Sequence, residues 1–169
     1  MQTDENINGL KGWLIVVLLG IIISLVTTFY SMMANFFPIF TNNYWDILTQ
    51  PGSSAYHPLW GPTLIFEIIG HIIFCIFCVI LICLFFMKHF RFPMTYIAFR
   101  IIIVLYSTAD LILVNLIPAA SEANSMQPAA QLGKSILGAG IWITYMVSSN
   151  RVQNTFIKKE VPNTNISST

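Results

Sequence analysis

Four long apolar stretches separated by polar segments dominate the chain. They cover residues 13–37, 62–87, 94–117 and 131–149. A helix needs about 20 predominantly apolar residues to cross the hydrocarbon core of a bilayer, and each stretch is close to that length. The pattern predicts an all-α integral membrane four-helix bundle. We expect one transmembrane domain over residues 1–150, followed by a tail at 151–169 whose polar end is disordered.

Composition agrees with a membrane location. Of the 169 residues, 56% are hydrophobic and 9% are charged, whereas a soluble domain carries roughly 25% charged residues. The first stretch is too long for a cleavable signal peptide, whose apolar core spans about 7 to 15 residues, so we expect a retained span. The net charge of +1 gives no basic surface for phosphates, and we expect no nucleic-acid partner.

The positions of lysine and arginine predict the orientation. Six of these residues flank the stretches on one side: Lys11, Lys88, Arg91, Arg151, Lys158 and Lys159. The two loops on the other side, residues 38–61 and 119–130, contain none. Because short loops that carry lysine and arginine stay in the cytoplasm, both termini are predicted to be cytoplasmic.

Ionisable residues inside the predicted spans are the candidates for function. They are Glu67, His71, Arg100, Asp110 and Lys134. Such groups are costly in lipid and often mark functional sites. From the helical rise, Glu67, His71, Asp110 and Lys134 fall in the outer half of the membrane and form a candidate intramembrane polar cluster, whereas Arg100 is an inner-side charge. The competing interpretation is that the long side chains reach the interfaces and Asp110 bonds to a neighbouring hydroxyl or amide.

Small residues on the first span predict where another helix approaches it closely. They form a stripe of Gly20, Ser24, Thr27, Ser31 and Ala34.

No motif supports catalysis or metal binding. His71, Cys75 and Cys78 share a helical face, but a structural zinc site needs four ligands and no fourth is at hand. The spans also show neither a serine close to a histidine nor the second aspartate that a hydrolytic centre would need. We therefore predict no catalytic residues, no metal site and no cofactor.

Three segments carry a resemblance to a known family. They are residues 9–14 (Gly-Leu-Lys-Gly-Trp-Leu), residues 91–93 (Arg-Phe-Pro), and residues 141–145 (Ile-Trp-Ile-Thr-Tyr) running into 149–152 and 155–156. In this order they resemble the bacterial inner-membrane family catalogued as domain of unknown function 2569, over essentially the whole chain. Members often have proline where this chain has Thr144. The resemblance implies a multi-pass protein with four spans in the bacterial inner (cytoplasmic) membrane and carries no activity with it.

Two functional classes lead. The first is a non-enzymatic membrane protein that contacts the lipid bilayer and binds a lipid, a small molecule, a partner membrane protein or a second copy of itself. The alternative is a small proton- or cation-linked transporter that acts as an oligomer and uses Asp110, Glu67 and His71 as a relay. An enzyme ranks third. A polar cavity that reaches the inner side would favour transport, and a pocket open to lipid or to the outside would favour binding.

Overall fold

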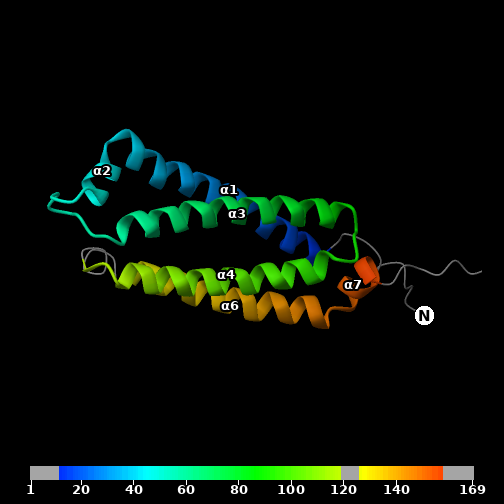
Figure 1. Ribbon diagram of the computed structural model, residues 1–169. Coiled ribbons are helices and arrows are strands. Elements are labelled where there is room, and N and C mark those ends of the chain that lie inside the picture. The colour runs from blue at the N-terminus through cyan, green and yellow to red at the C-terminus, as the bar shows by residue number, and fades with distance from the viewer. Residues whose placement is uncertain (1–11, 119–125, 158–169) are drawn as a thin grey trace, which may run out of the picture.

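The computed structural model describes residues 12–118 and 126–157, and the regular elements in these ranges are all helices, as predicted. Four long helices run alongside one another (Figure 1): α1 (Trp13–Thr41), α3 (Trp60–Phe86), α4 (Phe92–Asn115) and α6 (Met126–Ser148). Short helices lie at their ends: α2 (Tyr44–Thr49), α7 (Asn150–Val152) and a π-helical turn (Gln153–Ile157). We refer to the two ends of the molecule as the α2 end and the α7 end.

Three of the long helices are long and apolar enough to cross a membrane: α1, with 29 residues, α3, with 27, and α4, with 24. They mark the chain as a multi-pass membrane protein. Helix α6 has 23 residues but does not reach the same apolar character. Its first half carries Gln127, Gln131 and Lys134, which lower its hydrophobicity.

The helix boundaries extend the predicted ones by up to about a turn at several ends. Helix α1 passes through Pro38 to Thr41, and the backbone N–H of Asn42 donates to the Pro38 carbonyl at 3.0 Å. The predicted loop 38–61 contains α2, which starts after Asn43 in a left-handed conformation, with φ of 57°. The ring of Trp45 stacks on Phe40 with centroids 5.7 Å apart, and this contact holds α2 against the end of α1. Residues 119–125 of the second predicted outer loop lie outside the described residues.

The long helices form two antiparallel pairs, α1 with α3 and α4 with α6, and contacts between α3 and α4 join the pairs. The hydrophobic core is concentrated at the α7 end. It takes Leu14 and Val17 from the start of α1, Leu81 and Phe85 from the end of α3, and residues from the start of α4 and the end of α6. The four helices are therefore packed together most tightly at one end.

The segment after α6 completes this core. Val152 is fully buried, and Phe156 stacks on Phe92 with ring centroids 4.7 Å apart and lies 5.9 Å from the ring of Phe85. Residues 151–157, predicted as the start of a tail, are thus helical and packed, because Val152 and Phe156 lie four residues apart on one face. Residues 158–169, which include the end predicted to be disordered, lie outside the described residues.

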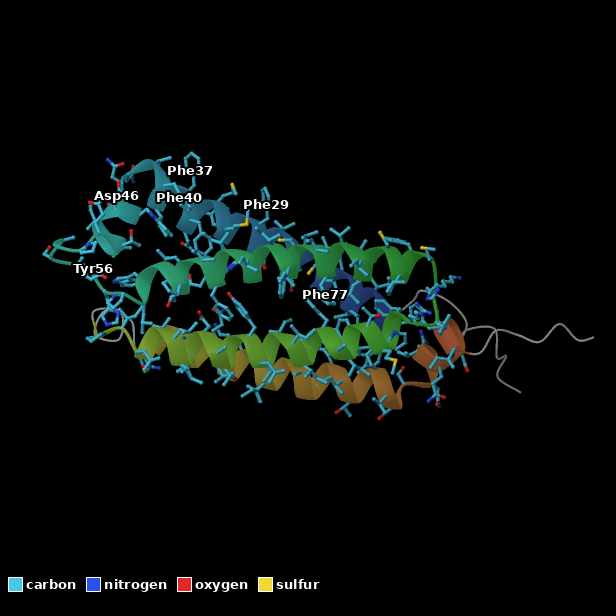
Figure 2. The ribbon with its side chains drawn as sticks, in the orientation of Figure 1. Phe29, Phe37, Phe40, Asp46, Tyr56 and Phe77 are labelled. Carbon is cyan, nitrogen blue, oxygen red and sulfur yellow. The ribbon has the colours of Figure 1, made fainter. Side chains whose placement is uncertain are left out.

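The predicted packing stripe on α1 packs only in part, because Ser24 and Ser31 are half-buried while its other members are not. Gly20, Thr27 and Ala34 are exposed, and a Cβ added at Gly20 would meet nothing within 4 Å. The buried side of α1 carries larger residues instead, among them Leu14 and Ile21. Figure 2 shows the opposite side of this helix, where Phe29 and Phe37 project away from the other helices. Side-chain volume rather than close backbone approach therefore holds α1 in place.

The C-terminal contact generates a prediction. Phe156→Ala should lower the free energy of unfolding in detergent by about 3 kcal/mol, because truncation of a buried phenylalanine leaves a cavity. Phe86→Ala is the matched control, since Phe86 is 62% exposed. Equal losses in the two variants would show that the segment after α6 does not belong to the core.

Candidate functional site

The inner face of α3 brings together the polar residues near the α2 end. One side of the helix carries Thr63, Glu67 and His71, which are spaced by four residues. Gly70 follows Glu67 by three residues and lies on the same side. Thr63 is 1% exposed. From α4, Tyr106 and Asp110 occupy two consecutive turns at the same end of the molecule. The site is thus formed by α3 and α4, where the two helix pairs meet.

His71 is held in one orientation. Its Nδ1 lies 2.7 Å from the backbone carbonyl oxygen of Glu67, one turn earlier. A carbonyl oxygen can only accept, so Nδ1 carries the hydrogen and donates it. The ring of Phe36 from α1 packs edge-on against the imidazole with centroids 5.2 Å apart. In the neutral imidazole the remaining nitrogen, Nε2, is therefore a hydrogen-bond acceptor.

Two carboxylates adjoin this histidine. Asp110 lies within electrostatic range of His71 and of Glu67, but no ion pair joins any two of these three side chains. Oδ1 of Asp110 is buried and accepts no hydrogen bond from any residue that the structure describes. The structure therefore brings Glu67, His71 and Asp110 together, and we call these three residues the polar cluster.

Tyr106 joins the helices beside the polar cluster. Its hydroxyl donates to the Glu67 carbonyl at 3.4 Å, and its ring stacks on Phe66 with centroids 4.9 Å apart. The ring lies directly against Gly70, where an added Cβ would collide with it. Sequence reasoning missed both residues, since neither is ionised. The signal in the sequence that could have indicated this close contact was Gly70, a glycine on the same helical face as Glu67 and next to His71.

The other two ionisable residues of the spans lie elsewhere. Lys134 is exposed on α6 and forms no ion pair with another described residue. The guanidinium of Arg100 lies against Gly138 of α6, where a Cβ would collide with it, and stands 6.0 Å from the centroid of the Tyr96 ring. Arg100 thus occupies the interface between α4 and α6, about 15 Å along α4 from Asp110.

A pocket of about 300 Å³ lies beside the polar cluster, on the α7 side of it. Aromatic and aliphatic side chains of α3 and α4 form most of its wall, and Phe77, which Figure 2 shows on the side of α3 that faces α4, is one of them. Its polar lining consists of His71, Tyr106 and Ser107 together with Thr28 from α1 and Gln131 from α6. The polar cluster therefore adjoins one end of an apolar pocket.

The pocket opens at the surface and closes toward the α7 end. Ile69, Ile73 and Ile102 line it and are also between 42% and 50% exposed. Beyond Phe77, the next inward-facing residues of α3 are Cys78 and Leu81, both with no exposed surface. Packed side chains thus separate the pocket from the α7 end. In the described part of the chain, no three His, Cys, Asp or Glu side chains gather in a way that could hold a metal ion.

An all-α fold with three membrane-type helices and a pocket between them defines a small multi-pass membrane protein. The chain belongs to the family described as Protein of unknown function (DUF2569), whose sequence model matches residues 7–157. This match confirms the resemblance found in the sequence. No curated protein and no solved structure matches the chain.

The polar cluster generates a prediction about stability. Asp110→Asn and His71→Gln should each lower the free energy of unfolding in detergent. The double variant should lose less than the sum, with a coupling of about 0.5 to 3 kcal/mol, because the two side chains interact.

A second double-mutant cycle, which combines Asp110→Asn with Lys134→Met, serves as the control. We expect these losses to add within about 0.5 kcal/mol, since Lys134 is exposed and pairs with no described residue. Additive losses in the cycle of Asp110→Asn with His71→Gln would contradict an electrostatic interaction between His71 and Asp110.

Proposed function

We propose that this protein spans the bacterial inner membrane four times and binds the apolar chain of an amphiphilic molecule taken from the bilayer, with no catalytic step. The pocket between α3 and α4 is the observation that carries the proposal. Binding sites for small ligands are concave and mostly apolar, with a few polar groups that fix orientation. This pocket has that character, with the polar cluster beside it.

The opening of the pocket favours a ligand from the lipid phase. The exposed isoleucines at its mouth, among them Ile69 and Ile73, would face hydrocarbon in a bilayer. A chain can therefore enter sideways without crossing water. A volume of about 300 Å³ is at the small end for ligand pockets, so it suits one chain rather than a whole two-chain lipid.

The same geometry gives less support to the transporter alternative. A proton or cation relay would need polar groups that continue from the polar cluster to the α7 end. Between the pocket and the α7 end, the path instead contains Cys78, Leu81 and Phe85, and each of these side chains is at most 1% exposed. Binding is therefore the function that the arrangement supports best.

Two observations support α6 as the fourth span. Its 23 residues extend about 35 Å, which exceeds a hydrocarbon core of about 30 Å. It also lies along α4 for most of that length (Figure 1). With four spans, the α7 end carries Lys88, Arg91 and Arg151, so we assign it and both termini to the cytoplasm.

The topology has a direct test. A reporter that is active only in the cytoplasm, fused after Thr169, should be active. A cysteine at Ser53 should react with a membrane-impermeant thiol reagent in intact spheroplasts, whereas one at His89 should react only after lysis. Labelling of the His89 position in intact spheroplasts would reverse the orientation.

Photolabelling tests the pocket. Phospholipids with a diazirine in one acyl chain, reconstituted with the protein in nanodiscs, should label pocket residues such as Phe77 and Ile103 above the level of exposed residues on α1. Ile73→Trp should reduce this labelling several-fold, because the larger side chain would obstruct the mouth.

Ile72→Trp is the matched control. Ile72 and Ile73 are neighbours with the same exposure of 45%, but only Ile73 lines the pocket. Binding in the pocket would be contradicted if the pocket were labelled no more strongly than the lipid-facing surface. It would also be contradicted if both variants reduced the labelling equally.

A further inference from the structure

We infer that the ligand of the pocket carries a primary ammonium head group, which the polar cluster binds. This inference deepens the proposed function and rests on it. It concerns the chemistry of the head group, whereas the proposed function concerns only the apolar chain.

The polar cluster presents hydrogen-bond acceptors. In the neutral imidazole, donation by Nδ1 of His71 to the Glu67 carbonyl leaves Nε2 with a lone pair. Oδ1 of Asp110 is buried without a donor among the described residues. The hydroxyl hydrogen of Tyr106 is directed to the same carbonyl, which leaves the oxygen lone pairs. A ligand that donates hydrogen bonds is the complement of this set, because a buried acceptor left unpaired is costly.

The charge of the polar cluster points the same way. Glu67 and Asp110 lie within range of each other, and in the described ranges neither forms an ion pair with a lysine, an arginine or His71. A cation between two carboxylates removes their mutual repulsion, and the gain is larger in a medium of low dielectric constant. A phosphate or carboxylate head would add a third negative charge at the same place.

The positions fit an amphiphile with its head toward the α2 end. His71 and Tyr106 line the pocket, whereas Glu67 and Asp110 lie outside its lining, each within one helical turn of a lining residue. From there the wall continues toward the α7 end as Phe74, Phe77 and Phe99. The nitrogen would therefore lie at the polar cluster and the chain among the phenylalanines.

A trimethylammonium head is the closest competitor. It carries the same charge and can contact aromatic rings such as Phe66 and Tyr106. It has no N–H, however, so it would leave Nε2 of His71 and Oδ1 of Asp110 without donors. This difference separates recognition by hydrogen bonds from recognition by charge alone.

Four single-chain diazirine amphiphiles of equal chain length test the inference on the full-length protein in nanodiscs. Their heads are a primary ammonium, a trimethylammonium, an alcohol and a carboxylate. We expect the ammonium probe to label the pocket most strongly. Asp110→Asn should reduce its labelling about tenfold, the effect of losing one charge-assisted hydrogen bond. Asp46→Asn, at an exposed carboxylate on α2, should leave it unchanged.

The outcomes separate the two claims. Equal labelling by the ammonium and trimethylammonium probes, or by the ammonium and alcohol probes, would overturn the inference while leaving a chain-binding pocket in place. Preferred labelling by the carboxylate probe would do the same. Both claims would be overturned if none of the four probes labelled the pocket more strongly than it labels the exposed face of α1. The comparison of probes on the unchanged chain stands even if Asp110→Asn fails to fold.

Discussion

The aromatic contacts at the α7 end determine how the rest of the molecule is arranged. Phe85 of α3, Phe92 of α4 and Phe156 after α6 pack on one another, and Leu14 and Val17 from the start of α1 join the same core. All the long helices are therefore fixed at one end. Toward the α2 end few residues are buried, and the separation of α3 and α4 leaves the pocket. A bundle that is closed at one end and open at the other can hold a ligand without a path to the closed end.

Polar side chains on the long helices differ in whether they find a partner within the protein. In lipid, polar groups must find partners within the protein. The hydroxyls of Thr27, Thr108 and Thr144 do so locally, since each donates to the carbonyl four residues earlier in its own helix. Asp110 and the nearby Thr63 do not, because Oδ1 of Asp110 and Oγ1 of Thr63 are buried without a partner among the described residues. A bound head group that donates to Oδ1 of Asp110 would complete the site, and this is the physical basis of the proposed binding function.

Hydrophobic patterning predicted the helices well because a span must be apolar for about 20 residues whatever it packs against. It missed α2, a single helical segment of six residues, and the packing of Phe156, which depends on where the ends of α3 and α4 come together. Shared depth grouped Glu67, His71 and Asp110 but also Lys134, which lies exposed on α6, because depth does not say which way a side chain faces. The roles of Tyr106 and Gly70 depend on the contact between α3 and α4, so the sequence of one helix does not reveal them. The side of α1 that packs likewise depends on the side-chain volumes of the neighbouring helices.

Binding requires that an apolar chain from the bilayer occupy the space between α3 and α4. A crystal structure of the protein grown from a lipidic mesophase tests it most directly. We expect elongated density between Phe77 and Phe99, with its polar end within hydrogen-bond distance of His71 Nε2 and Asp110 Oδ1. A pocket filled by the protein's own side chains, or a chain of ordered water running from the polar cluster to the α7 end, would contradict it.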